Sequence, residues 1–455
     1  MTRVHFIAVG GAVMHNLAIA LHKKGYIVTG SDDEIFEPSR GRLKEYGLLP
    51  SSMGWEASRI SEDIDTVILG MHAKEDNPEL KRAKELGIKI MSFPEYLYDQ
   101  TKDKRRIVVA GSHGKTTTTA MIMHVLRTSG VSFSYMVGSS IDGFETMVGL
   151  SDESKIAVFE GDEYLTSPLD RRPKFHLYKP DIAVITGIAW DHMNVFPTFE
   201  NYLGQFRIFI DTIAENGSLI FFGDDREAAG LSSEARSDIR RIPYKTHGYF
   251  QNKTGFYAAT HDRVVPMRIF GEHNMQNLSA AREACHLAGV TDEQFYDSIR
   301  TFEGTSRRLQ KLLETEIGIV YLDFAHAPSK VRATINAVAE RYPQREIIAC
   351  LELHTYSSLN ADFLPQYSGT MESATYSFVY FNPHAVAMKK LSLLSKEHVE
   401  KLFGGKNLKA FDISTDMFNN IKGLRVKDPV YLLMSSGDFD GTDMLKLAGE
   451  LLSNK

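Results

Sequence analysis

A strand, a glycine loop and a helix follow one another without interruption between residues 107 and 130. The first four residues are apolar, the next six (111–116) read Gly-Ser-His-Gly-Lys-Thr, and apolar side chains then recur at helical spacing. This order is the setting of a phosphate-binding P-loop, whose glycines let the backbone approach phosphates and whose helix directs N–H groups at them. Lys115 can reach the β- and γ-phosphates, and the Thr116 hydroxyl can bind Mg²⁺. The loop is a shortened one, because the general pattern has a glycine where this chain has Val109.

Carboxylate and histidine side chains follow two later apolar runs that we expect to be buried strands. The run at 156–159 leads directly into Glu160, the first of three carboxylates in four positions, and the run at 182–185 leads to Asp191 and His192. Ligand sites of α/β proteins form at the carboxyl ends of such strands, and Mg²⁺ prefers hard oxygen ligands. Taken alone, either segment could instead be a solvated loop. The predicted metal ligands are Thr116, Glu160 and His192.

Apolar runs and helical stretches alternate along the whole chain, which predicts an α/β fold with mainly parallel sheets. A charged stretch at 99–106 and a Gly-Thr-Ser-Arg-Arg segment at 304–308 mark two boundaries. The predicted domains are residues 1–103, 104–304 and 305–455. Strands are expected at residues 5–9, 26–29, 66–69, 107–110, 156–159, 182–185, 219–222, 320–324, 347–351, 378–381 and 430–434, and short antiparallel pieces at 230–270.

The composition is that of an ordinary globular protein and excludes several classes. The chain has 455 residues and a net charge of −6, which argues against nucleic acid and an anionic membrane as partners. It has two cysteines, no apolar run close to the roughly 20 residues that span a bilayer, and no signal-peptide layout at its start. We therefore expect a cytoplasmic protein.

Six segments, in order along the chain, resemble the motifs of the Mur ligase family, the ATP-dependent amide-forming ligases of peptidoglycan assembly. The P-loop comes first, followed by the acidic segment at 160–163 and the Asp-His-Met segment at 191–193. Residues 271–277 (Gly-Glu-His-Asn-Met-Gln-Asn), 304–308 and 323–328 (Asp-Phe-Ala-His-Ala-Pro) complete the set. The resemblance implies three domains: a Rossmann-like N-terminal domain, a central P-loop ATPase-like domain and a C-terminal Rossmann-like α/β domain.

The resemblance also implies a site for ATP and Mg²⁺. Asn277 would contact adenine, Asp323 the ribose, and Arg308 the phosphates when the last domain closes; His273 could instead be a packed structural histidine. The implied catalytic residues are Lys115, Glu160 and His192. The implied ATP-binding residues are Gly111, Ser112, His113, Gly114, Lys115, Thr116, Thr117, His273, Asn274, Asn277, Arg308, Asp323 and His326.

The N-terminal run at residues 5–14 resembles the sugar-nucleotide loop of the branch that acts on UDP-N-acetylmuramate, with Ala8 and Val13 where glycines are usual. The Gly-Ser-Asp at 30–32 also matches that branch. Phe206 supports it, because several other members carry a carbamylated lysine at this position. The implied UDP-sugar residues are Gly10, Gly11, Ala12, Val13, Met14, Ser31, Asp32 and His72.

Two acceptors remain open within this branch: L-alanine, used in de novo synthesis, and the tripeptide L-alanyl-γ-D-glutamyl-meso-diaminopimelate, used in peptidoglycan recycling. Residues 163–175 resemble the recycling ligase, since the alanine-adding branch has a shorter connection there, and we favour the tripeptide. Residues 354–357 (His-Thr-Tyr-Ser) resemble the alanine-adding branch instead. The basic residues Arg171, Arg172 and Lys174 could neutralise the acidic peptide or the UDP diphosphate, or form a solvated loop. A monomer or weak homodimer is expected.

The implied reaction has two steps, in which ATP converts the lactyl carboxylate into an acyl phosphate and the acceptor amine then displaces phosphate. His192 must be neutral to bind metal, so activity is expected to fall below about pH 6.5. Two rival functions stay open: a ligase that extends folate with glutamate, and a nucleotide-binding regulator that has lost catalysis.

Overall fold

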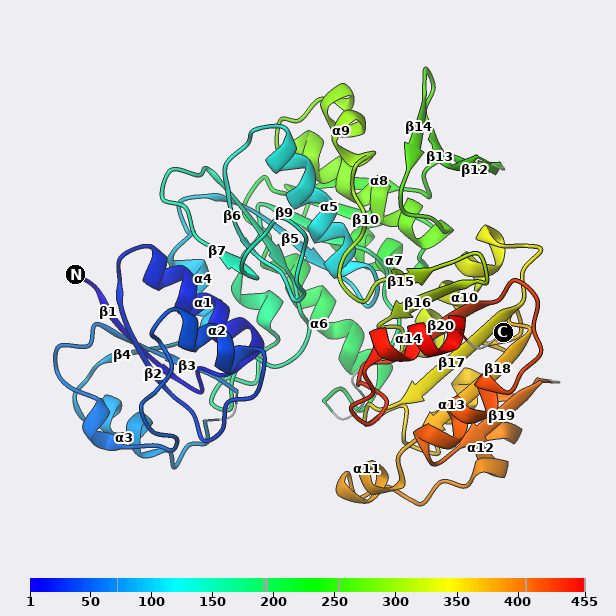
Figure 1. Cartoon of the computed structure of the whole chain (residues 1–455). Coiled ribbons are helices and arrows are strands. Elements are labelled where there is room, and N and C mark those ends of the chain that lie inside the picture. The colour runs from blue at the N-terminus through cyan, green and yellow to red at the C-terminus, as the bar shows by residue number, and fades with distance from the viewer. Residues whose placement is uncertain (72, 191–192, 194, 253, 406, 454–455) are drawn as a thin grey trace. The chain divides into compact units, whose positions relative to one another are not determined.

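The computed structural model describes residues 1–455 except 72, 191–192, 194, 253, 406 and 454–455 (Figure 1). The chain forms two compact units. The first consists of Met1–Ile188, Glu200–Lys245 and Asn277–Ile299, and the second of Ala189–Phe199, Thr246–Gln276 and Arg300–Lys455. The domain boundaries expected near residues 103 and 304 stay a prediction. Within the part of the chain described here, no helix combines the length and the apolar character needed to cross a bilayer.

The N-terminal part of the first unit is a parallel sheet of four strands in the order β2-β1-β3-β4. Its elements are β1 (Arg3–Ile7), α1 (Ala12–Lys23), β2 (Ile27–Ser31), α2 (Ser39–Glu45), the 3₁₀ turn η1 (Ala57–Arg59), β3 (Thr66–Leu69), α3 (Pro78–Glu85), β4 (Lys89–Ser92) and α4 (Phe93–Asp99). The second strand was expected at 26–29 and instead reaches Ser31, because Gly30 and Ser31 pair with Phe6 and Ile7 of β1.

The rest of the first unit is built on a sheet of seven strands in the order β11-β10-β9-β5-β8-β6-β7, parallel except where β6 meets β7. Its elements are β5 (Arg105–Ala110), α5 (Lys115–Thr128), β6 (Phe133–Met136), β7 (Val148–Gly149), β8 (Ile156–Glu160), η2 (Lys174–Leu177), β9 (Ile182–Ile185), α6 (Phe199–Asp211), β10 (Ser218–Phe222), α7 (Arg226–Glu234), β11 (Arg240–Tyr244), α8 (Glu272–Leu287) and α9 (Asp292–Ile299). Of these, Phe199 of α6 and residues 272–276 of α8 fall in the second unit. The P-loop strand β5 lies between β8 and β9, so both strands predicted to carry metal ligands are its direct neighbours.

Two expectations for this sheet need correction. The strand expected at 107–110 begins two residues earlier, at Arg105, inside the charged stretch at 99–106. Arg106 is buried because its guanidinium donates to the carbonyl oxygens of Thr101 (3.0 Å) and Lys104 (2.7 Å) and pairs with Asp181 (3.0 Å). Glu160, expected just after its strand, is the last residue of β8.

The region from 230 to 270 contains the expected antiparallel pieces and one parallel strand that was not expected. The strands β12 (Tyr249–Asn252), β13 (Gly255–Ala259) and β14 (Val264–Met267) form an antiparallel sheet, seen in green in Figure 1. In contrast, β11 pairs in parallel with β10 at the edge of the seven-stranded sheet.

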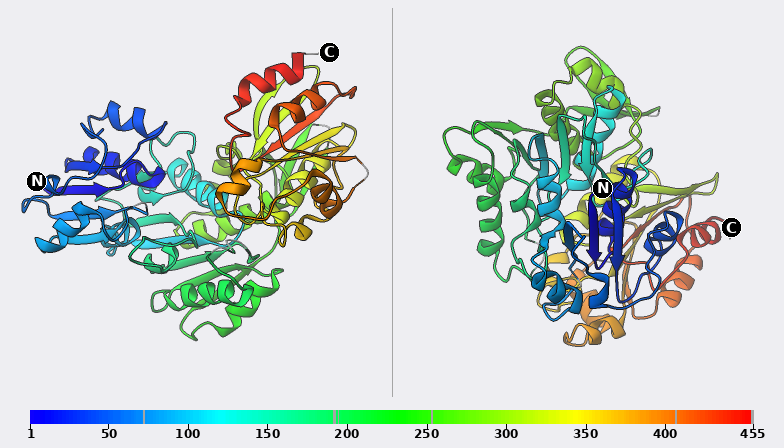
Figure 2. Two further views of the ribbon diagram at one scale, coloured as in Figure 1. Left: turned by 90° about the horizontal axis from the view of Figure 1, so that it is seen from below. Right: turned by 90° about the vertical axis from the view of Figure 1, so that its left-hand side faces the viewer.

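The second unit contains a sheet of six strands in the order β15-β16-β20-β17-β18-β19, parallel except for β15. Its elements are β15 (Gln310–Glu314), β16 (Ile319–Asp323), α10 (Pro328–Arg341), β17 (Ile347–Leu353), η3 (Leu364–Tyr367), β18 (Tyr376–Phe381), α11 (Pro383–Met388), α12 (Lys396–Phe403), β19 (Leu408–Phe411), α13 (Ser414–Lys422), β20 (Val430–Met434) and α14 (Met444–Ser453). All five residues of β20 are buried, and Tyr431 and Leu433 pack in one cluster with residues of α13 and α14. Figures 1 and 2 show these two helices, in orange and red, beside the sheet. Burial on both faces explains the continuous apolar runs of these strands.

Candidate active site

The loop between β5 and α5 has the backbone of a phosphate-binding turn. Gly111 has φ +127° and Gly114 has φ +71°, a region that favours glycine. A Cβ on Gly111 would collide with the Thr186 hydroxyl, and a Cβ on Gly114 would collide with the Asn277 side-chain oxygen. Gly114 is the N-cap of α5 and has no side chain to cap the helix, so the first N–H groups of α5 are available to an anion.

Lys115 is held beside this loop by two oxygen atoms. Its Nζ donates to the Gly111 carbonyl oxygen (2.6 Å) and lies 2.7 Å from Glu163 Oε2. Burial alone would lower the pKa of Lys115, but the carboxylates of Glu163, Asp162 and Glu160 hold it above its ordinary value. The lysine is therefore a positive charge already positioned next to the loop.

Glu163 connects that charge to α6, through a contact that the sequence did not reveal. The buried Tyr202 hydroxyl donates to Glu163 Oε1 (3.2 Å) and lies 2.8 Å from the Ser112 hydroxyl. Ser112, Tyr202, Glu163 and Lys115 thus form one polar chain under the loop. Phe206, one turn further along α6, packs edge-to-face on Tyr202 in the same buried region, with ring centroids 5.3 Å apart.

Thr116 and Glu160, two of the predicted metal ligands, are in contact, and their oxygens suit a Mg²⁺ ion, whose binding stays a prediction. Thr116 Oγ1 donates to Glu160 Oε1 (2.8 Å), and the backbone N–H of Gly138 donates to Glu160 Oε2 (2.7 Å). Both side chains are buried, and a hydroxyl beside a carboxylate is a hard-oxygen pair of the kind Mg²⁺ takes together with nucleotide oxygens and waters. Outside the undescribed positions, no group of three or more His, Cys, Asp or Glu side chains converges. The third predicted ligand, His192, lies outside the described residues, as does its neighbour Asp191.

The Gly-Glu-His-Asn-Met-Gln-Asn segment forms the start of α8. The Asn277 side-chain oxygen accepts a hydrogen bond from Thr118 Oγ1 of α5 (3.3 Å), in addition to its closeness to Gly114. Asn274 Nδ2 donates to the Phe270 carbonyl oxygen (2.8 Å) at the start of the same helix. Burial lowers the pKa of His273, which favours the neutral ring. The contacts of these residues with a nucleotide stay a prediction.

Arg308, Asp323 and His326 belong to the second unit and take part in its own hydrogen bonding. Asp323 ends β16 with a buried carboxylate that accepts the backbone N–H groups of Leu309 (2.6 Å) and Ala325 (2.7 Å). The Arg308 guanidinium lies over the Phe324 ring (4.8 Å), and His326 Nδ1 lies 2.9 Å from the Phe324 carbonyl oxygen. These contacts order the turn after β16, and the predicted roles of the three residues toward ATP stay untested.

The predicted UDP-sugar loop joins β1 to α1 and is fastened to the end of β2. The Gly10 N–H donates to Asp32 Oδ2 (2.7 Å), and the Ser31 carbonyl oxygen accepts the N–H groups of Ala8 (2.9 Å) and Val9 (3.0 Å). Ala8 has φ +69°, the left-handed region that the usual glycine would occupy without strain. Burial raises the pKa of Asp32 to about 6. Gly11 is the N-cap of α1, which contains Ala12, Val13 and Met14, whereas His72 lies outside the described residues.

The basic residues after the acidic segment are mostly paired within the chain. Arg172 forms a two-pronged contact with Asp170 (2.6 and 2.9 Å), and Lys174 Nζ lies 2.5 Å from Asp162 Oδ2. Arg171 is exposed and forms no ion pair with a described residue. Of the three cations predicted to neutralise a substrate, Arg171 alone is unpaired among the residues described.

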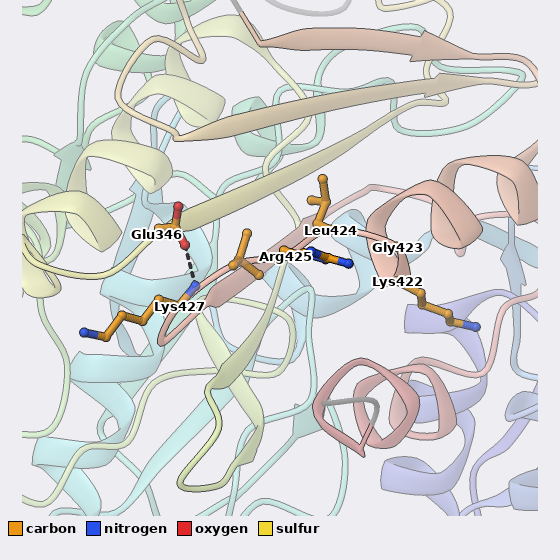
Figure 3. Close-up of a pocket in the computed structure, with 7 residues that line it drawn as sticks. Glu346, Lys422, Gly423, Leu424, Arg425 and Lys427 are labelled. Carbon is orange, nitrogen blue, oxygen red and sulfur yellow. Dashed lines mark hydrogen bonds between the residues drawn. The ribbon is translucent and has the colours of Figure 1, made fainter.

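A pocket in the second unit has no predicted site residue in its lining (Figure 3). It is lined by Glu346 and residues 422–427, including three cations. Figure 3 shows the Lys422 and Lys427 side chains pointing in opposite directions, and Lys422 pairs with Glu450 (2.5 Å). The cations do not converge, so we do not assign this pocket to the site.

A P-loop at the carboxyl end of a parallel sheet, with a lysine, a threonine and a buried carboxylate around it, defines a nucleotide-binding α/β enzyme. The chain matches the model of the Mur ligase middle domain over residues 109–285 and that of the Mur ligase family catalytic domain over residues 3–105. It is 31% identical over 390 residues to the UDP-N-acetylmuramate-L-alanine ligase of Lacticaseibacillus paracasei, covering 82% of this chain and 83% of the relative. The chain belongs to the Mur ligase family, whose members are ATP-dependent, amide-forming ligases of peptidoglycan biosynthesis.

Two further comparisons extend this result. The chain is 29% identical over 352 residues to the UDP-N-acetylmuramate-L-alanyl-gamma-D-glutamyl-meso-2,6-diaminoheptandioate ligase of Haemophilus influenzae, covering 75% of this chain and 77% of the relative. The solved structure of a UDP-N-acetylmuramate-alanine ligase from Thermotoga maritima matches with a TM-score of 0.70 and 21% identity, covering 97% of each chain. The predicted α/β fold and the ligase class are therefore confirmed.

Proposed function

We propose that this protein joins the lactyl carboxylate of UDP-N-acetylmuramate to the amino group of L-alanyl-γ-D-glutamyl-meso-diaminopimelate, at the expense of ATP, in peptidoglycan recycling. The observation that carries the proposal is the P-loop, with Lys115 already charged and Thr116 beside Glu160 (2.8 Å). That arrangement fits a reaction whose first step brings two anions together.

In that first step a lactyl carboxylate oxygen attacks the γ-phosphorus of ATP, and the bond to ADP breaks. The demand on the protein is to neutralise charge, and Lys115 and the N–H groups at the start of α5 meet it. In the second step the acceptor amine attacks the acyl carbonyl, the amide bond forms, and phosphate leaves with the former carboxylate oxygen. Thr116 and Glu160 would hold Mg²⁺, which would neutralise phosphate charge when bound, and His192 stays a predicted ligand.

Lys115 must change partners for this to happen. In the structure its Nζ is 2.7 Å from Glu163, so the γ-phosphate has to displace that carboxylate. Tyr202 donates to Glu163 from the other side and can retain it when the lysine turns to phosphate. After the exchange Lys115 pairs with phosphate, and Glu163 keeps the hydrogen bond from the Tyr202 hydroxyl.

The loop after the acidic segment supports the tripeptide as acceptor. Thr166 closes it by donating from both its N–H (3.0 Å) and its hydroxyl (2.6 Å) to the Arg172 carbonyl oxygen, and Leu165 bridges to Pro173. Arg171 lies at the exposed end of this closed loop. A guanidinium without an ion-pair partner among the described residues suits an acidic peptide, which carries several carboxylates. L-Alanine carries only one.

L-Alanine is the second candidate acceptor. Residues 354–357 support it, and so does the 31% identity to the Lacticaseibacillus paracasei alanine ligase. The test measures phosphate release from ATP with UDP-N-acetylmuramate and either L-alanine or the tripeptide, with mass spectrometry of the product. We expect a preference for the tripeptide that Arg171→Ala reduces. A preference for L-alanine would replace the proposal by the de novo activity, and no turnover with either would favour a regulator.

A further inference from the structure

A buried carboxylate in the N-terminal sheet has no role in the chemistry above. Glu79 lies in the first turn of α3 and is completely buried. Its Oε2 accepts hydrogen bonds from the Ser31 hydroxyl and lies 3.2 Å from His5 Nε2, and its Oε1 accepts the Glu56 N–H (3.0 Å). The Arg59 guanidinium is 3.7 Å away. One side chain thus joins β1, β2 and the turn at 54–59.

The surroundings keep Glu79 charged. Burial alone would raise its pKa, but the hydrogen bonds from His5, Ser31 and the Glu56 N–H hold the pKa below its ordinary value. The carboxylate also lies at the N-terminus of a helix, where negative charge is favoured. His5 is itself buried, and its other ring nitrogen is 2.8 Å from the Thr29 hydroxyl. A buried carboxylate is costly to keep charged unless hydrogen bonds compensate, and Glu79 has such bonds.

Ser31 connects Glu79 to the predicted sugar-nucleotide loop through hydrogen bonds. While its hydroxyl bonds to Glu79, its carbonyl oxygen accepts the N–H groups of Ala8 and Val9, which begin the loop. The side chain of the next residue, Asp32, accepts the Gly10 N–H, and the backbone carbonyl oxygen of Asp32 accepts the Gly54 N–H. Arg59, beside Glu79, donates to the Gly54 carbonyl oxygen (2.9 Å). The start of the loop is therefore connected to Glu79 through Ser31. Gly10, further along the loop, is connected to the same region through Asp32, Gly54 and Arg59.

We propose that Glu79, supported by His5, is the positioning residue of the donor site, which fixes Ser31 and Asp32 so that the loop at residues 8–12 is preformed for the nucleotide diphosphate. The inference rests on the proposed function, because it takes UDP-N-acetylmuramate as the donor. Neither Glu79 nor His5 is accessible to a ligand, at 0% and 1% exposure, so any effect on the donor must pass through the loop.

The test compares wild type with Glu79→Gln, which keeps the shape of the side chain but removes the charge that three hydrogen bonds and the nearby Arg59 stabilise. We expect Kd and KM for UDP-N-acetylmuramate to rise about tenfold, with KM for ATP and kcat changed less than about twofold. Calorimetry with UDP-N-acetylmuramate and no ATP gives Kd without turnover. An unchanged donor Kd in a folded Glu79→Gln protein would overturn the inference.

Glu352→Gln is the matched control. Glu352 is also buried, also accepts from a serine hydroxyl (Ser435) and also lies beside a histidine (His354, 3.6 Å), but it belongs to the second unit. Glu352→Gln should lower the thermal stability about as much as Glu79→Gln does, but leave the donor Kd unchanged. If Glu352→Gln raised the donor Kd as much as Glu79→Gln, the effect would be a general structural one. Should Glu79→Gln fail to fold, His5→Asn takes its place with a smaller expected rise. If wild type does not bind UDP-N-acetylmuramate at all, the proposed function is wrong rather than the positioning role.

Discussion

At the scale of single residues, Lys115 is bound to a carboxylate before any phosphate arrives. The 2.7 Å contact with Glu163 neutralises the lysine, and the Tyr202 hydroxyl stabilises the other carboxylate oxygen. We therefore expect the affinity for nucleotide to reflect a competition between Glu163 and the phosphates for one ammonium group.

Removing the charge of Glu163 should make that competition easier for ATP. We expect Glu163→Gln to lower the Kd of a non-hydrolysable ATP analogue by about three- to tenfold, since each tenfold corresponds to ~1.4 kcal/mol. Tyr202→Phe keeps the carboxylate but removes the hydrogen bond that retains Glu163 when Lys115 turns to phosphate, so this substitution should not lower the Kd. Calorimetry measures both, and a weaker or unchanged Kd in Glu163→Gln would show that Glu163 does not compete with phosphate.

Asp32 gives a second prediction, for the pH dependence of stability. Its pKa in the folded protein is about 6, raised by burial from an ordinary 3.8. Between these values the unfolded chain has lost the proton and the folded chain retains it. The free energy of unfolding therefore contains a contribution that is complete below pH 3.8 and disappears as the pH rises through about 6.

Asp32→Asn lacks this titration, so its stability relative to wild type should increase from pH 4 to about pH 6 and stay level above. Urea unfolding at several pH values measures the difference. A difference that is constant over this range would mean that Asp32 is ionised throughout.

At the scale of elements, the phosphate loop is fixed by what surrounds two glycines. Gly114 and Gly130 have nearly the same backbone, with φ +71° and +73°, at the two ends of α5. A Cβ on Gly130 meets nothing within 4 Å, whereas a Cβ on Gly114 would strike the Asn277 side chain. Comparing alanine substitutions at Gly114 and Gly130 therefore distinguishes the free-energy cost of the left-handed backbone from the cost of the collision with Asn277.

We expect Gly130→Ala to lower the free energy of unfolding by about 1–2 kcal/mol, the cost of the left-handed conformation, with ATP affinity unchanged. Gly114→Ala should cost more, because Asn277 must also move, and should weaken ATP binding at least about tenfold because the loop shifts from its phosphate-binding form. Thermal unfolding and nucleotide titration give both numbers. Equal effects of the two substitutions would contradict the role assigned to Asn277.

The strands differ in how well the sequence predicts them. The strands β9 and β20 coincide with the predicted residues, because strands buried on both faces need continuous apolar runs. The strand β11 was not recognised, because it lies at a sheet edge and contains Arg240, Arg241 and Pro243, which an edge tolerates.

The site divides in a similar way. The closeness of Thr116 and Glu160 could be predicted, because Thr116 begins the helix that the phosphate loop joins to β5, and Glu160 ends β8, the parallel neighbour of β5. The contact of Tyr202 with Glu163 could not, because 39 residues separate them and α6 carries no local motif at this position. The contacts of Glu79 with His5 and Ser31 could not be predicted either, because these partners are 74 and 48 residues away in the sequence.

At the scale of the whole molecule, the predicted site residues share one structural rule. Ser31 ends β2, the phosphate loop follows β5, Glu160 ends β8 and Asp323 ends β16, so three different sheets offer polar groups at the carboxyl ends of parallel strands. The proposed reaction has three reactants, a sugar nucleotide, ATP and an amine, and we expect each to meet one of these strand ends.

The central claim, that ATP activates the donor carboxylate as an acyl phosphate, has a direct test. UDP-N-acetylmuramate labelled with ¹⁸O in both lactyl carboxylate oxygens is turned over with ATP and the tripeptide, and the released phosphate is examined by ³¹P NMR or mass spectrometry. The account predicts one ¹⁸O atom in each phosphate released and one retained in the amide product. Unlabelled phosphate during amide formation would contradict it.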